Sequence, residues 1–159
     1  MTSKMPPSDK PATLQLNQFF PYRLSQLNAS VSEVIAQLYS GRFDLTPHAW
    51  RVVATLGENE QLAATEIAQL TSLEKMQVSR AISSLKATGL IMQEVDRKDR
   101  RFSRLRLSDD GRKVYQQIVP LVTAREGYLL SVLSDEEKTL LYALIDRIAN
   151  QAETLKKLG

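Results

Sequence analysis

The stretch that decides the fold is "EKMQVSRAISSLKATGLIMQEVDRKDRRFSRLRLS", residues 74–108. Its first half places Val78 and Leu85 on one side of a predicted helix, since an α-helix advances about 100° per residue. Its second half ends with Leu105 and Leu107 alternating with arginines, which is the period of a half-buried strand. We therefore expect a helix followed by a β-hairpin whose charges lie at the tip.

The face of this helix opposite its apolar side is short and polar. Such a surface fits the major groove of DNA, where Gln pairs with adenine, Arg binds guanine or a phosphate, and an apolar tip contacts the thymine methyl. A solvated surface helix has the same pattern and stays an alternative. On the first interpretation, the residues of this helix predicted to contact DNA are Lys75, Met76, Gln77, Ser79, Arg80, Ser83 and Ser84.

A shorter helix is predicted just before it, over residues 65–70, and Gly89 is expected to end the longer one. Two helices separated by only a few residues suit a helix-turn-helix. A helix-turn-helix followed directly by a basic hairpin is a winged helix, in which the second helix enters the major groove and the hairpin tip reaches the backbone or the adjacent minor groove. The wing residues predicted to contact DNA are Arg97, Lys98, Arg100 and Arg101.

Positive charge is concentrated in this part of the chain. Between Lys75 and Arg106, nine Lys or Arg residues stand against three acidic residues, whereas the net charge of the whole 159-residue chain is only +3. The remainder is therefore slightly acidic. Because the field of exposed charges acts within roughly 8 Å at physiological salt, this distribution favours a polyanion over general adhesion.

Carboxylates stand among the wing cations. Asp99 near Arg101 can fix the guanidinium and spare some of the entropy lost on binding, so Asp96 and Asp99 are predicted to orient the wing. The alternative is that Asp is simply favoured in tight turns. The residues alone do not separate these two interpretations.

Helices are also predicted on both sides of the winged helix. Thr46 and Ser134 are suitable N-caps, and Gly57 is a plausible C-cap. The fold class is therefore mainly α with a small β-hairpin wing. The expected divisions are a disordered tail over residues 1–16, an N-terminal helix over 17–45, the DNA-binding lobe over 46–108 and two C-terminal helices over 109–159.

The chain resembles the MarR (multiple antibiotic resistance regulator) family of dimeric winged-helix transcription regulators over residues 17–157. The segment "EIAQLTSLEKMQVSRAISSLKATGLI" is similar to the family's helix-turn-helix, and "DRKDRRFSRLRLSDDG" is similar to its wing and to the start of its next helix. Ala63 departs from the family pattern, which commonly has Ser or Thr capping the first helix of the motif. The residues that match the recognition helix are Val78, Ser79, Arg80 and Leu85, and those that match the wing signature are Asp96, Asp99 and Arg101.

The resemblance implies a homodimer whose first and last helices intertwine, so residues 17–45 and 109–159 are the expected dimerisation helices. A two-fold dimer presents two recognition helices about 34 Å apart, so a pseudo-palindromic duplex is the expected partner. An apolar stripe through Leu27, Val31 and Leu38 agrees with such an interface. The alternatives are a bundle within one chain, and a helical dimeric adaptor that binds an acidic protein instead of DNA.

The family often has a ligand pocket between the dimerisation helices and the DNA-binding lobe. The candidates to line it here are Tyr22, Arg23, His48 and Trp50, and aromatic walls with one cation would suit a small aromatic acid or its acyl thioester. The alternative is that the aromatic residues are plain core and that Arg23 forms an interface salt bridge.

Several classes of function are disfavoured. The chain has no Cys and one His, so it offers neither a thiol nucleophile nor a His-based metal site, and we expect no catalytic residues, no bound metal and no cofactor. No run of about 18 apolar residues occurs, so no membrane span is expected. The first residues carry no secretory signal, and the predicted location is the cytoplasm.

Overall fold

The computed structural model describes residues 11–159, which are mainly α-helical with one two-stranded antiparallel sheet. The chain divides into two units, Met1–Val34 and Ile35–Gly159, which are described separately here. The tail expected over residues 1–16 lies mostly outside the described residues. Among the described residues, a 3-10 helix, Leu16–Gln18, comes first.

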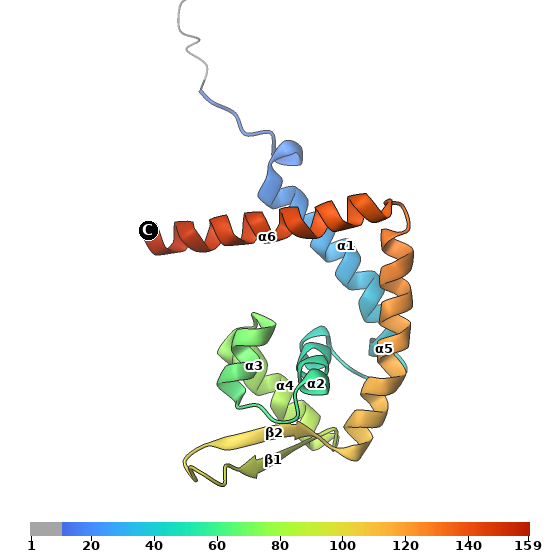
Figure 1. The fold of residues 1–159 in the computed structure, drawn as a ribbon, viewed down its shortest axis with the longest axis vertical. Coiled ribbons are helices and arrows are strands. Elements are labelled where there is room, and N and C mark those ends of the chain that lie inside the picture. Colours follow the sequence, from blue (N-terminus) through green and yellow to red (C-terminus); the bar gives the residue numbers. More distant parts are fainter. Residues whose placement is uncertain (1–10) are drawn as a thin grey trace, which may run out of the picture. The chain divides into compact units, whose positions relative to one another are not determined.

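The predicted order of helices and strands is confirmed, with small differences at the ends (Figure 1). The elements are α1 (Phe20–Ser40), α2 (Pro47–Glu58), α3 (Ala64–Thr71), α4 (Lys75–Ala87), β1 (Ile91–Val95), β2 (Ser103–Leu107), α5 (Asp109–Leu130) and α6 (Asp135–Leu158).

The predicted helix starts are confirmed by their caps. The hydroxyl oxygen of Thr46 accepts a hydrogen bond from the N–H of Ala49 at 3.1 Å, and Ser134 and Glu137 form a reciprocal capping box at the start of α6. Gly89 follows α4 with a φ of +76°, a conformation that costs glycine little. Residue type and spacing at these positions are therefore sufficient to predict where these helices begin and end.

Gly57 is a correction, because it does not end α2. The helix continues to Glu58 and Asn59 is its C-cap. A Cβ on residue 57 would lie 2.3 Å from the ring of Tyr115, so a glycine is needed here for the approach of α5 and not for a left-handed turn.

The core of the larger unit lies where α2 packs against α3, α4, α5 and β2. Figure 1 shows α3, α4 and the hairpin gathered around α2. The side chains from these elements that are almost completely buried include Val52, Val53, Leu56, Ile67, Leu85, Leu105 and Ile118. Burial of each aliphatic side chain contributes about 1.5 to 3 kcal/mol.

The hairpin is fixed to the helix-turn-helix by its backbone. The two strands pair from Ile91 with Leu107 to Val95 with Ser103. Leu62, in the segment before α3, forms an antiparallel bridge with Leu105 through two hydrogen bonds of 3.0 and 2.8 Å. The base of the wing is therefore held in one register relative to α3.

Two helices leave large apolar side chains exposed. In α1, Leu24 and Leu27 are more than half exposed. In α6 no residue is buried, and the exposed side chains include the apolar Leu140, Ile145 and Ile148. Contiguous exposed apolar surface of this kind usually marks a binding surface. Among residues 11–159, no helix combines the length and apolar character needed to cross a membrane.

Candidate nucleic-acid interface

The turn between α3 and α4 sets the direction of the recognition helix. Ser72 has a φ of +55°, and Glu74 is the N-cap of α4. The inner side of α4 buries Val78, Ala81 and Leu85, as the spacing predicted. The opposite side of α4 therefore points away from the core.

Six of the seven residues predicted to contact DNA from this helix are exposed. The exposed residues are Lys75, Met76, Ser79, Arg80, Ser83 and Ser84. Their mixture of hydroxyls, two cations and a thioether can offer hydrogen bonds to base edges, charge to phosphates and an apolar contact to a thymine methyl. Within the part of the chain that the structure describes, the side chains of these six residues form no hydrogen bond or ion pair that such a contact would have to break.

Gln77 differs from the interpretation made from the sequence, because it is half-buried and occupied. Its Oε1 accepts a hydrogen bond from the backbone N–H of Glu74 at 3.0 Å, which caps the start of α4. Within the described residues its amide nitrogen makes no hydrogen bond that competes with a base. Gln77 can therefore cap the helix and still donate to DNA.

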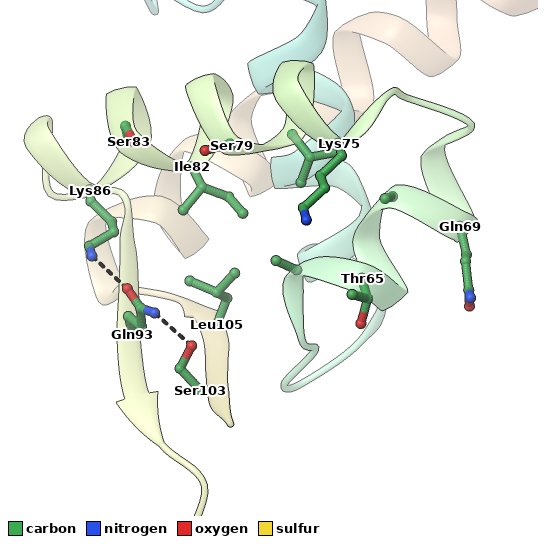
Figure 2. Close-up of a pocket in the computed structure, with 13 residues that line it drawn as sticks. Thr65, Gln69, Lys75, Ser79, Ile82, Ser83, Lys86, Gln93, Ser103 and Leu105 are labelled. Carbon is green, nitrogen blue, oxygen red and sulfur yellow. Dashed lines mark hydrogen bonds between the residues drawn. The ribbon is translucent and has the colours of Figure 1, made fainter. Parts of the chain in front are cut away.

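A groove of about 740 Å³ lies between α3, α4 and the hairpin (Figure 2). Its walls are apolar at Val78, Ile82 and Leu105, and three of the predicted DNA contacts, Lys75, Ser79 and Ser83, lie on its rim. At one end a polar chain connects α4 to both strands, since Gln93 accepts from the ammonium group of Lys86 and donates to the hydroxyl of Ser103 at 2.6 Å. The recognition helix and the hairpin thus share one polar rim.

Asp96 shapes the wing turn. Its Oδ1 accepts hydrogen bonds from the backbone N–H of Lys98 at 2.7 Å and of Asp99 at 3.2 Å, and its Oδ2 accepts from Nε of Arg104 at 3.0 Å. These contacts, with the Arg104 side chain the largest, hold the pKa of Asp96 below its ordinary value. The carboxylate is therefore ionised over the whole physiological pH range.

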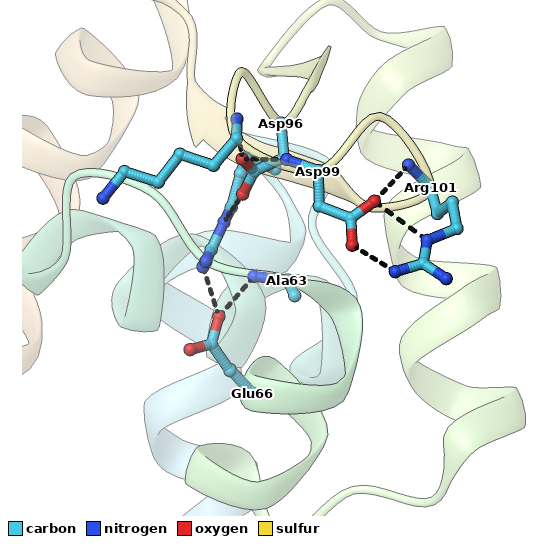
Figure 3. A network of polar contacts seen from close by, with 7 residues as sticks. Ala63, Glu66, Asp96, Asp99 and Arg101 are labelled. Carbon is cyan, nitrogen blue, oxygen red and sulfur yellow. Dashed lines mark hydrogen bonds and ion pairs between the residues drawn. The ribbon is translucent and has the colours of Figure 1, made fainter.

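Asp99 holds Arg101 as a bidentate partner (Figure 3). Its Oδ1 accepts from Nε of Arg101 at 3.0 Å, and its Oδ2 accepts from Nη2 at 2.8 Å. The same Oδ1 accepts from the backbone N–H of Arg101 at 3.0 Å. The guanidinium lowers the pKa of Asp99, and the carboxylate raises the pKa of Arg101. The carboxylate therefore accepts a backbone hydrogen bond within the turn and also holds the guanidinium.

The remaining predicted wing cations, Arg97, Lys98 and Arg100, are exposed at the tip. The side chain of Arg101 itself is 85% exposed although it is held by Asp99. Positive charge at the tip is thus presented to solvent, as a contact to a phosphate or to a narrow minor groove requires.

Arg104 was missed as a functional candidate when the sequence was considered alone. Its Nη1 donates to Oε2 of Glu66 at 2.8 Å, while its Nε donates to Asp96. The alternation of Arg104 with Leu105 predicted only a strand. No local signal marks a partner 38 residues earlier in the chain.

Glu66 replaces the missing cap at Ala63. Alanine has no side chain that can cap α3, but Oε2 of Glu66 accepts from the backbone N–H of Ala63 at 2.7 Å (Figure 3). Of the two hydrogen bonds of a capping box, the one accepted by the N-cap side chain is therefore lost, and the one accepted by Glu66 is kept.

The four candidate ligand-binding residues are placed in two units. Tyr22 and Arg23 are exposed in α1, within the first unit, whereas His48 and Trp50 are half-buried in α2, within the second. Trp50 is stacked between Tyr39 and Tyr115, with ring centroids 5.6 and 6.3 Å away. This stacking supports the interpretation of Trp50 as a packing residue.

The described residues offer no site for a metal ion, because nowhere in residues 11–159 do three or more His, Cys, Asp or Glu side chains converge. The interface is instead built from cations, hydroxyls and one amide. Such groups bind phosphates and base edges.

Comparison with known proteins agrees with this geometry. The sequence model of the MarR family matches residues 43–101, which include α2, α3, α4, β1 and most of the wing turn. The HTH-type transcriptional regulator FarR of Neisseria gonorrhoeae is 26% identical over 112 residues, which cover 70% of this chain and 77% of FarR.

Solved structures have the same fold. The MarR family transcriptional regulator SPO1453 from Silicibacter pomeroyi is 27% identical, with a TM-score of 0.72 over 86% of this chain and 99% of that one. BpsR of Bordetella bronchiseptica, whose DNA binding is regulated by 6-hydroxynicotinic acid, is 19% identical, with a TM-score of 0.79 over 87% of this chain and 98% of BpsR. The matching sequence model, the relatives and the winged helix together support a MarR family winged-helix transcription regulator.

Proposed function

We propose that the chain acts as a homodimeric repressor that binds a pseudo-palindromic duplex and is released by a small aromatic acid or its acyl thioester. The observation that carries the DNA-binding part is the combination of an exposed polar face on α4 with a wing whose Arg101 is held by Asp99. In this proposal α4 reads the major groove, and the wing cations contact the flanking backbone or minor groove. The protein would act on DNA in the cytoplasm.

The homodimer is supported by the exposed apolar side chains of α1 and α6. A second copy is the partner that would cover both surfaces and place two recognition helices about 34 Å apart. Sedimentation tests this part, since Val31→Glu on the apolar stripe of α1 should abolish dimerisation and folding together. A well-folded wild-type monomer at micromolar concentration would contradict the dimer.

The ligand part rests on BpsR, whose DNA binding responds to an aromatic acid, and on the type of side chains at Tyr22, Arg23 and His48. A ligand shifts the DNA-binding equilibrium only by its difference in affinity for the two states, so a coupling of about 1 to 3 kcal/mol is expected. Arg23 would bind the carboxylate.

Footprinting on the DNA upstream of the protein's own gene tests the function as a whole. A two-fold protected site is expected, and it should be lost on addition of an effective member of a panel of hydroxybenzoates, hydroxycinnamates and their thioesters. Arg23→Ala should keep the footprint and lose the response to the ligand. A footprint that no compound changes would contradict the ligand part and leave the DNA-binding part intact.

A further inference from the structure

One carboxylate oxygen connects the start of the helix-turn-helix to the wing. Oε2 of Glu66 accepts the backbone N–H of Ala63 at 2.7 Å and Nη1 of Arg104 at 2.8 Å (Figure 3). Glu66 lies in the first turn of α3, and Arg104 lies on β2. The charge that caps α3 is therefore the same charge that binds the second strand.

Arg104 also binds the turn at the wing tip. Its Nε donates to Oδ2 of Asp96 at 3.0 Å, while Oδ1 of Asp96 accepts the backbone N–H groups of Lys98 and Asp99. Asp99 in turn holds the guanidinium of Arg101. A continuous series of charge-assisted hydrogen bonds thus runs from the cap of α3 to the exposed cation at the tip.

The backbone alone does not provide this connection. The bridge between Leu62 and Leu105 holds the base of the hairpin. Beyond the last strand pair the N–H of Asp96 donates to the carbonyl oxygen of Phe102 at 2.8 Å, which closes the turn but does not connect it to α3. An arginine suits the position because its planar guanidinium offers Nε and Nη1 in a fixed geometry to two carboxylates at once. A lysine has a single ammonium group and cannot reproduce that geometry.

We propose that Arg104 is a positioning residue that fixes the wing tip, and Arg101 with it, in one orientation relative to α4. The inference rests on the proposed DNA contacts of α4 and of Arg101, and it adds that the two contacts are coupled through Arg104 and Glu66. The wing is then ordered before DNA binds, so less conformational entropy is lost in the complex.

The test compares Arg104→Ala with Arg106→Ala. Arg106 is the matched control because it lies on the same strand and forms an ion pair with Glu94 at 3.0 Å, but forms no hydrogen bond or ion pair with α3. Both variants lose one cation. Arg104→Ala should lower affinity for the operator about tenfold, and Arg106→Ala less than about threefold. Equal losses in the two folded variants would overturn the proposal.

A double-mutant cycle separates positioning from general stability. If Arg104 acts by orienting Arg101, the double variant Arg104→Ala with Arg101→Ala should bind no more weakly than the weaker of the two single variants. Losses in affinity that multiply would overturn the proposal. An Arg101→Ala variant that binds as tightly as the wild type would instead contradict the proposed wing contact itself.

Glu66→Gln keeps the test valid if Arg104→Ala fails to fold. Glutamine at this position can still accept the N–H of Ala63 and preserve the cap, but it removes the charge that binds Arg104. The expected result is an unchanged melting temperature with a several-fold loss of affinity that disappears in the Arg101→Ala background. A loss of the same size in both backgrounds would count against the coupling.

Discussion

The backbone of Gly111 packs directly against the carbonyl group of Leu90. A Cβ on residue 111 would lie 1.9 Å from the carbonyl oxygen of Leu90, which is closer than any Cβ can approach. The same oxygen accepts the backbone N–H of Ser108 at 3.0 Å. The first turn of α5 therefore depends on a residue with no side chain.

Gly111→Ala should lower the free energy of unfolding by about 2 to 4 kcal/mol, because the backbone of Leu90 cannot move without disturbing β1 and the end of α4. Urea denaturation of both proteins measures the change. Gly41→Ala is the control, since a Cβ on residue 41 meets nothing within 4 Å. Equal stabilities of the two variants would show that α5 can move away at little cost.

Ser72→Gly should stabilise the protein by about 0.5 to 1 kcal/mol. Ser72 has a φ of +55° in the turn of the helix-turn-helix, and a glycine occupies that region without steric cost. Asp44 has a φ of +51°, but Asp tolerates this region better than Ser, so Asp44→Gly should gain less. The comparison is made by thermal unfolding, and a larger gain for Asp44→Gly would contradict the argument.

Arg101→Ala should weaken DNA binding about tenfold and leave the fold intact, because the side chain is exposed and contributes no core. The salt dependence of the affinity should fall by about one released counterion. Lys156→Ala removes a cation near the end of α6 and should change neither quantity. An unaltered affinity of folded Arg101→Ala at physiological salt would refute the assigned role of the wing.

Gln77→Glu and Gln77→Ala should differ in stability, and both should lose the base preference that the amide donors set. Glutamate keeps the acceptor that caps α4, whereas alanine removes it and should cost about 0.5 to 1 kcal/mol of stability. Both remove the amide donors and should relax the base preference at one symmetric pair of operator positions. Binding-site selection measures this preference.

Arg80→Ala provides the contrast to Gln77. Because Arg80 is proposed to bind phosphate in part, its loss should lower the affinity for all DNA sequences more uniformly. It should also reduce the salt dependence of binding. If selection returns the wild-type preference for the Gln77 variants and for Arg80→Ala, the proposed orientation of α4 on DNA is wrong.

The ion pair of Asp96 with Arg104 should contribute stability above about pH 4 and lose it below. The pKa of Asp96 is lowered in the folded protein by Arg104 and by two backbone N–H groups. A lowered pKa means that the ionised form favours folding, so the contribution is complete above the unfolded pKa of about 3.9 and is lost as the pH falls through the folded pKa. The stability difference between wild type and Asp96→Asn should therefore be constant from about pH 6 to 8 and shrink in acid. A difference that changes near neutral pH would assign the titration to another group.

The features that were predicted from the sequence depend on neighbours close in the chain. Thr46 and Ser134 cap helices through hydrogen bonds to residues three positions later, and Leu105 and Leu107 mark a strand by simple alternation. These interactions are visible as spacing, because local backbone geometry brings the partners together.

The features that were missed depend on partners far apart in the chain. Gly57 is predicted as the C-cap of its helix, and that prediction is wrong because the contact that favours glycine here is with Tyr115, which is distant in the chain. Arg104 lies on a strand as predicted, but its ion pair with Glu66 is not visible in the sequence because Glu66 lies 38 residues away. Gln77 was placed on the exposed face because helical spacing does not show that a side chain folds back to cap its own helix.

Trp50 is the only tryptophan of the chain, and it is stacked between Tyr39 and Tyr115 where the end of α1, α2 and α5 meet. All indole fluorescence of the protein therefore originates from this one junction. Emission excited selectively at the indole will report any rearrangement of α5 or of the end of α1 against α2, without an attached dye. The protein thus contains its own optical probe at the junction of α1, α2 and α5.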